Sequence, residues 1–209
     1  MRSDYPPDVT LYLVDDDQDA RDAMVGLFGS GCGFRVQAFA SGEEFLQRAN
    51  TQVPHCVLLD LRMDNGMTGL QVQEALLKQA SPMVVLFLSG HGDIPTAMDA
   101  RNNGAYDWLV KGMDTDKLQA KVVAAMHEAG LRTQHHQERA AVLGRWNELS
   151  PRKKEAARLI RQGWSSKLVA DEMNIGVRVA EKYRSDVFET LWVINPTELD
   201  RLMRDFEVQ

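Results

Sequence analysis

The chain has 209 residues, of which 44% are hydrophobic, and this is enough for two compact domains that each bury a core. It contains no run of eighteen apolar residues and no apolar stretch near Met1, so we expect a soluble, cytoplasmic protein without a membrane span or signal peptide. Its only cysteines, Cys32 and Cys56, exclude a disulfide framework and stand at no zinc-ligand spacing, so we expect buried reduced thiols.

Charge is divided unevenly along the chain. Residues 1–130 carry 10 Lys and Arg against 18 Asp and Glu, a net charge of −8, whereas residues 131–209 carry 14 against 12, a net charge of +2. This division is typical of an acidic module that handles phosphate or metal, joined to a module that binds nucleic acid. Two solvated surfaces of different charge explain it equally well.

Short apolar runs alternate with amphipathic stretches from Val9 onward. This alternation predicts βα units, and the apolar character of the runs indicates a parallel sheet that is covered on both faces. We expect five strands, at residues 9–14, 34–39, 55–59, 83–88 and 105–110. Helices are expected in the gaps. Ser41 with Glu44 three positions later predicts one helix start, and Ile94-Pro95 places a proline in the first turn of another.

The second half of the chain shows helical spacing without strands. Apolar residues at 118, 122, 126 and 129 predict a helix, and the polar stretch 132–139 predicts a helical linker. Ser150-Pro151 then opens a new helix. We therefore expect an α/β domain over residues 1–128, a linker over 129–145 and an all-α domain over 146–209.

The all-α domain has the spacing of a helix-turn-helix. We expect helices at 165–173 and 177–192 with a turn at 174–176, and a last helix over 192–204. Four side chains of the second helix are expected to pack inward: Val179, Tyr183, Val187 and Leu191. Four are expected on the opposite, outward face: Arg178, Lys182, Ser185 and Glu189. A small helical bundle with ordinary solvated charges is the alternative.

Polar side chains follow four of the predicted strands, where open parallel sheets bind their ligands. They are Asp15-Asp16-Asp17, Asp60, Ser89 and Lys111. Carboxylates brought together repel one another unless a cation joins them, and their hard oxygens favour Mg²⁺. With a Lys and a Ser beside the metal, the set suits phosphoryl transfer to a carboxylate nucleophile. Each residue alone has a plain structural explanation, such as a helix cap, and only the combination indicates this chemistry.

The segments LYLVDDD, CVLLDLRM, FLSGHGD and GAYDWLVK together resemble the receiver domain of two-component response regulators, over about residues 8–128. The resemblance implies a flavodoxin-like doubly wound fold with Asp60 as phosphoacceptor. It also implies Mg²⁺ ligands from Asp16, Asp60 and the backbone carbonyl of Arg62, with Asp15 acting through water. Ser89 and Lys111 would contact the phosphoryl group, and Trp108 would take the place of the switch aromatic, usually Tyr or Phe. Asp17 is a spare acid.

The receiver segment departs from the family pattern at three places, which bear on switching more than on phosphate acceptance. The stretch 63–69 lacks the usual Pro and is one residue longer. Gly112 replaces the Pro that usually follows the Lys, so a cis-prolyl turn is not expected. Trp108 is bulkier than the residues that usually fill its place.

The stretch LSPRKKEAARLIRQGWSSKLVADEMNIGVRVAEKYRSDVF resembles the LuxR-type output domain of FixJ/NarL-type regulators. On this match, three side chains would face base edges: Glu181, Lys182 and Ser185. Three would lie nearer phosphates: Lys167, Arg178 and Arg184. The family's usual Thr-Val pair is Val179-Ala180 here, and its common His is Tyr183, so base preference does not transfer.

We therefore expect a response regulator that a sensor histidine kinase phosphorylates with Mg²⁺, that forms a homodimer when phosphorylated, and that binds duplex DNA to control transcription. No enzymatic turnover is expected beyond its own phosphorylation and dephosphorylation. Two alternatives within this family are an output that does not depend on phosphorylation and a helical tail that binds RNA or protein. A third is an aspartyl-phosphate hydrolase with Asp15 as nucleophile, but the Thr or Val usual after its second acid is missing.

Overall fold

The computed structural model describes residues 9–64, 66–90 and 104–208, which form two compact units that divide between His136 and Gln137. The helix start expected at Ile94-Pro95 and the segment after Met1 lie outside the described residues. No helix in the described ranges is both long and apolar enough to cross a membrane.

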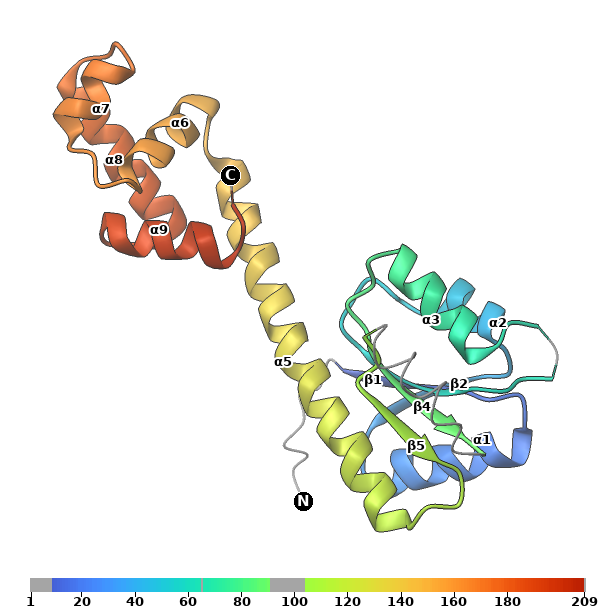
Figure 1. The fold of residues 1–209 in the computed structure, drawn as a ribbon. Coiled ribbons are helices and arrows are strands. Elements are labelled where there is room, and N and C mark those ends of the chain that lie inside the picture. The colour runs from blue at the N-terminus through green and yellow to red at the C-terminus, as the bar shows by residue number, and fades with distance from the viewer. Residues whose placement is uncertain (1–8, 65, 91–103, 209) are drawn as a thin grey trace. The chain divides into compact units, whose positions relative to one another are not determined.

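The first unit is built on a five-stranded parallel sheet (Figure 1). Its strands are β1 (Thr10–Val14), β2 (Arg35–Phe39), β3 (Cys56–Asp60), β4 (Val84–Ser89) and β5 (Asp107–Val110). They pair in the order β2-β1-β3-β4-β5, and every pairing is parallel. This order confirms the doubly wound, flavodoxin-like fold that the sequence predicts.

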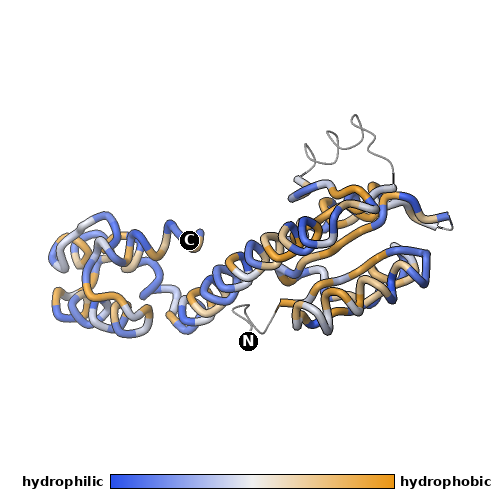
Figure 2. The backbone as a smooth tube through the Cα atoms, turned by 90° about the horizontal axis from the view of Figure 1, so that it is seen from below, coloured by the Kyte–Doolittle hydropathy of each residue, from blue (hydrophilic) through white to orange (hydrophobic). Residues whose placement is uncertain are grey.

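Helices cover both faces of the sheet. They are α1 (Gln18–Val25), the π-helical segment η1 (Gly26–Gly31), α2 (Gly42–Arg48), α3 (Gly69–Lys78) and the first part of α5 (Thr115–Glu148). One core joins alternate strand residues to Phe28 and α5, and a second core joins the others to Phe45 of α2 and Val72 of α3. The three central strands, β1, β3 and β4, are buried at every residue, whereas β2 at one edge of the sheet is mostly exposed. Hydrophobic stretches are visible along the backbone of this unit (Figure 2).

Side-chain caps fix where the helices begin beside the strand ends. Asp17 caps α1 by accepting hydrogen bonds from the backbone N–H groups of Asp19 and Ala20. Ser41 caps α2, as expected, by accepting from the N–H of Glu44. The Glu44 carboxylate in turn accepts from the N–H of Ala40, one residue before the cap. These caps place the loops at the carboxyl edge of the sheet.

The polar stretch expected as a linker is part of one helix, because α5 runs without interruption from Thr115 to Glu148. Within the first unit α5 packs through Val122, Met126 and Ala129. Its buried Thr133 hydroxyl lies 2.6 Å from the Pro54 carbonyl oxygen and 2.8 Å from that of Ala129. Polar composition therefore marks exposure here and no break in the helix.

The second unit is all-helical, with α6 (Pro151–Ile160), α7 (Ser166–Glu172), α8 (Val177–Leu191) and α9 (Pro196–Asp205) after the end of α5. Its own core includes Trp146, Ile160, Val169, Val187 and Leu199. Ser150 and Ser165 cap α6 and α7, as their positions in the sequence predict.

Two details of this unit correct the sequence analysis. The last helix does not begin at residue 192: Trp192 takes a left-handed conformation with φ 57° that ends α8, and Asn195 caps α9. Val179 was expected to pack but is exposed, and Ala180 is buried in its place. Val187 and Leu191 lie seven and eleven residues after Ala180, which keeps all three on one side of a helix with 3.6 residues per turn, whereas Val179 is rotated by about 100° from Ala180.

Candidate functional site

Strand register brings the predicted site residues to one edge of the sheet. Val14 pairs with Leu59, so Asp15 stands just beyond β1 beside Asp60, the last residue of β3. Asp60 pairs with Leu88, and Ser89 pairs with Val110, the residue before Lys111. This edge includes the point between β1 and β3 where the strand order reverses, the usual ligand position in such sheets.

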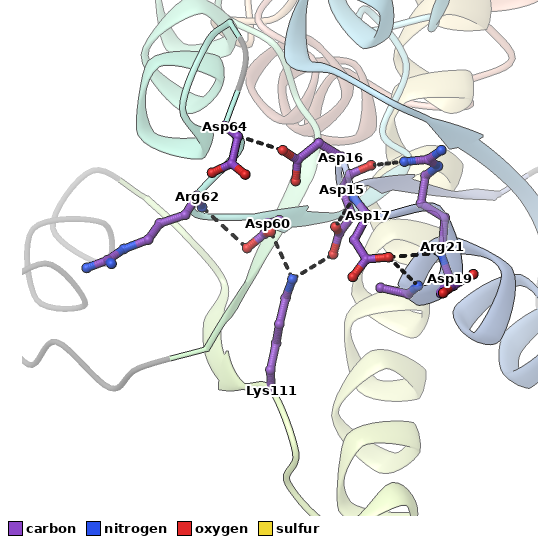
Figure 3. A network of polar contacts seen from close by, with 10 residues as sticks. Asp15, Asp16, Asp17, Asp19, Arg21, Asp60, Arg62, Asp64 and Lys111 are labelled. Atoms are coloured by element: carbon purple, nitrogen blue, oxygen red, sulfur yellow. Dashed lines mark hydrogen bonds and ion pairs between the residues drawn. The ribbon is translucent and has the colours of Figure 1, made fainter.

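Three carboxylates and one ammonium group meet there (Figure 3). One oxygen from each of Asp15, Asp16 and Asp60 lies within 4.8 Å of the others. The Lys111 Nζ lies 2.8 Å from Asp15 Oδ2 and 2.8 Å from Asp60 Oδ2. The side chain of Asp60 is only 6% exposed and that of Lys111 is 33% exposed, so a buried carboxylate is paired with an ammonium group that solvent reaches.

Burial and neighbouring charge set the protonation of this cluster. Burial raises the pKa of Asp60, and the Asp15 carboxylate raises it further, while the hydrogen bond and charge of Lys111 act in the opposite direction. Burial opposes the charge on Lys111, but its hydrogen bonds to both carboxylates and the attraction of their charges together outweigh burial and raise its pKa. Lys111 is therefore a fixed cation, and Asp60 is a carboxylate of increased basicity.

The donor set suits Mg²⁺, which prefers carboxylate and carbonyl oxygens. Asp15, Asp16 and Asp60 offer three carboxylates, and one ammonium group leaves their combined charge negative. Asp16 Oδ2 also accepts a hydrogen bond of 2.6 Å from the backbone N–H of Asp64, which fixes this carboxylate from the loop after β3. Asp17 does not join the cluster, because its carboxylate caps α1.

The other predicted receiver residues have these positions. Ser89 is buried at the end of β4, and its carbonyl oxygen accepts from the N–H of Lys111 at 2.7 Å. The backbone N–H of Arg62 donates to Asp60 Oδ1 at 3.3 Å. Trp108 is half-buried against Phe87, with ring centroids 5.3 Å apart, and its buried indole N–H meets no acceptor among the described residues.

The departures from the family pattern have local explanations. Gly112 has φ 84°, a left-handed conformation that Pro cannot adopt, so this turn is made in a different way from a prolyl turn. In the longer loop, Asn65 lies outside the described residues. The Glu43 carboxylate of α2 accepts a 2.7 Å hydrogen bond from the N–H of Met67. Sequence reasoning missed this tie, since no local pattern connects residues 24 positions apart.

The helix-turn-helix residues divide into two groups. Exposed side chains on α7 and α8 include five of the six that the sequence assigns to DNA: Lys167, Arg178, Glu181, Lys182 and Ser185. The sixth, Arg184, is half-buried between the two helices. Its Nε donates to the Ser166 hydroxyl at 3.1 Å, its Nη2 donates to the Trp164 carbonyl oxygen, and burial lowers its pKa.

Known proteins that are similar to this chain are response regulators, in agreement with the resemblance in its sequence. Residues 11–123 match the response regulator receiver domain family. The transcriptional regulatory protein FixJ of Bradyrhizobium diazoefficiens is 33% identical over 92% of this chain and 93% of that protein. The tetrathionate response regulatory protein TtrR of Salmonella typhimurium is 33% identical over 95% of this chain and 92% of that protein.

Solved structures resemble the chain over nearly its whole length. The response regulator StyR aligns with a TM-score of 0.80 and 26% identity, covering 93% of this chain and 98% of that one. Full-length FixJ of B. japonicum aligns with a TM-score of 0.56 and 31% identity, covering 97% and 98%. The fold, the acidic edge of the sheet and these relatives agree: the chain belongs to the response regulators, among those of the FixJ/NarL type.

Proposed function

We propose that a sensor histidine kinase phosphorylates Asp60 and that this modification controls DNA binding by the second unit. The observation that carries the proposal is the position of Lys111, whose Nζ lies 2.8 Å from both Asp15 and Asp60. An ammonium group there reduces the repulsion between the Asp15 and Asp60 carboxylates and the negative oxygens of an incoming phosphoryl group.

In the proposed reaction, an Asp60 carboxylate oxygen attacks the phosphorus of the kinase's phosphohistidine. A phosphorus–oxygen bond forms, the phosphorus–nitrogen bond breaks, and the imidazole leaves with the electron pair. Lys111 holds a phosphoryl oxygen by its charge, and Ser89, at the neighbouring strand end, donates a hydrogen bond to another. Asp15, Asp16, Asp60 and the Arg62 carbonyl would hold Mg²⁺, which when bound supplies positive charge to the phosphate oxygens.

The added charge must then change the output. Moving a two-state protein from mostly inactive to mostly active requires a differential stabilisation of about 5.5 kcal/mol. We propose that Ser89, Lys111 and Trp108 supply it at the receiver, and that the active form is a homodimer on paired DNA half-sites. The proposed readers of base edges are Glu181, Lys182 and Ser185, with Lys167 and Arg178 on phosphates.

The test uses the full chain with acetyl phosphate and Mg²⁺. Wild type should gain the mass of one phosphoryl group and bind a duplex selected from a random library more tightly, whereas Asp60→Asn should do neither. Equal DNA affinity in every condition would point to an output independent of phosphorylation. Binding to RNA or protein, with no salt-sensitive affinity for duplex DNA, would favour the other alternative.

A further inference from the structure

Arg184 has a different environment from the other cations of the helix-turn-helix. Lys167, Arg178 and Lys182 are exposed, whereas the Arg184 side chain lies between α7 and α8. Its guanidinium group lies over the Phe188 ring, 5.9 Å from the ring centroid. Within the described part of the chain, no carboxylate lies within ion-pair distance of it.

The two acceptors of Arg184 both belong to the start of α7. The Trp164 carbonyl oxygen comes two residues before that helix, and Ser166 is its first residue. A guanidinium group is a planar fork whose donors have fixed directions, so two simultaneous bonds restrain both distance and orientation. α7 has only seven residues, and its buried side chains, Val169 and Ala170, are its fourth and fifth. The fork therefore adds a polar restraint at the start of α7, where the side chains of its first three residues are not buried.

We propose that Arg184 is a positioning residue for DNA recognition, which fixes the start of α7 against the recognition helix α8 instead of binding phosphate itself. The inference rests on the proposed DNA-binding function. Lys167 directly follows Ser166 and is exposed, while Arg178 and Lys182 project from α8. Specific binding needs the contacts of both helices at once, whereas non-specific phosphate contacts adapt to a looser pair.

The experiment measures the affinity of the full chain for two DNA duplexes over a series of salt concentrations, with acetyl phosphate and Mg²⁺ present. One duplex is selected by the wild-type chain, and the other has an unrelated sequence. Arg184→Met keeps an unbranched aliphatic stem at this position and removes the guanidinium donors. We expect its affinity for the selected duplex to fall about tenfold or more, because this is the effect of losing a charge-assisted hydrogen bond. Its affinity for the unrelated duplex and the salt dependence of binding should stay unchanged. Arg178→Met is the matched control for a phosphate contact. It should weaken both duplexes and reduce the slope of log K against log salt by about 0.9.

Ser166→Ala gives an independent measurement, since it removes one acceptor and leaves Arg184 in place. It should cause a smaller loss of the same kind, and the double variant should bind no more weakly than Arg184→Met. The inference is wrong if Arg184→Met behaves like Arg178→Met, or if both Arg184→Met and Ser166→Ala keep full specific affinity. It is also wrong if specificity survives Ser166→Ala while Arg184→Met merely unfolds. A wild type that selects no duplex would instead refute the DNA-binding function.

Discussion

At the residue scale, the carboxylate of Asp60 is held between one attracting and one repelling charge. Lys111 and Asp15 both lie at its edge of the sheet, and burial adds to the repulsion by Asp15 in disfavouring the ionised form. The folded state thus binds a proton at Asp60 more tightly than the unfolded chain does. The ionised Asp60 carboxylate therefore lowers the stability of the folded first unit, a trade-off between function and stability that is common in proteins.

Asp60→Asn should therefore stabilise the first unit at neutral pH when Mg²⁺ is removed by a chelator. Because the folded pKa is raised above the ordinary value of 3.8, wild-type stability falls as pH rises from that value through the folded pKa, and stays reduced above it. Asn does not ionise, and Lys111 keeps Asp15 as its partner. A gain of about 1 kcal/mol at pH 7 raises the melting temperature by roughly 2–8 °C.

The measurement is the free energy of unfolding of wild type and Asp60→Asn between pH 4 and pH 7. The advantage of the variant should grow with pH. Asp17→Asn is the matched control, because Asp17 is an exposed helix cap and Asn caps a helix equally well. An Asp60→Asn variant that is less stable than wild type at pH 7 would show that the ion pair with Lys111 outweighs burial.

At the element scale, the turn between β5 and α5 depends on a backbone conformation that few residues adopt. Gly112 has φ 84°, and the N–H of Met113 closes the turn on the Val110 carbonyl oxygen at 3.1 Å. Lys111 and Gly112 are the two central residues of this turn, so its geometry helps to aim the ammonium group at Asp15 and Asp60. Gly112 is thus suited to this position for a conformational reason.

Restoring the Pro usual in the family at position 112 should destabilise the first unit. Proline fixes φ near −65°, so we expect Gly112→Pro to lower the free energy of unfolding by about 3 kcal/mol or more. A Cβ at this position meets no atom within 4 Å, so Gly112→Ala should lose only about 1–2 kcal/mol through the left-handed conformation. Gly112→Asn should lose less, since Asn tolerates that conformation. Urea unfolding of the three variants decides the order, and a Pro variant as stable as wild type would contradict it.

At the scale of the whole molecule, each unit has a core of its own. The first unit packs around its sheet and the second around α6, α8 and α9, and no residue in the described ranges belongs to the cores of both units. The three carboxylates that suit Mg²⁺ all belong to the first unit. A ligand that binds only the folded form of one unit stabilises that unit by mass action.

Calorimetry of the full chain should accordingly show two unfolding transitions, of which Mg²⁺ raises only one. At a Mg²⁺ concentration ten times the dissociation constant, the gain is about 1.4 kcal/mol. Asp16→Asn should reduce this gain, and Lys167→Met, in the second unit, should leave it unchanged. If Mg²⁺ shifted both transitions equally, or shifted neither, its proposed site in the first unit would be wrong.

The sequence by itself determined the elements and the chemistry at their ends. Apolar runs predicted the strands, Ser41, Ser150 and Ser165 predicted helix starts, and acids after β1 and β3 predicted a carboxylate cluster. Periodicity and capping act over a few residues, so they can be read from local sequence. The same reasoning placed Lys111 beside Asp60, because parallel strands end at one edge.

Only the tertiary structure decided which polar groups are covered and what they contact. The ties from Glu43 to Met67 and from Asp64 to Asp16 join distant segments. The resemblance to the output-domain family placed Arg184 near DNA phosphates, but its side chain is half-buried against the start of α7. A side chain's burial depends on which other elements lie against it, and that is set by the folding of the whole chain, because the local period fixes only its direction from the helix axis.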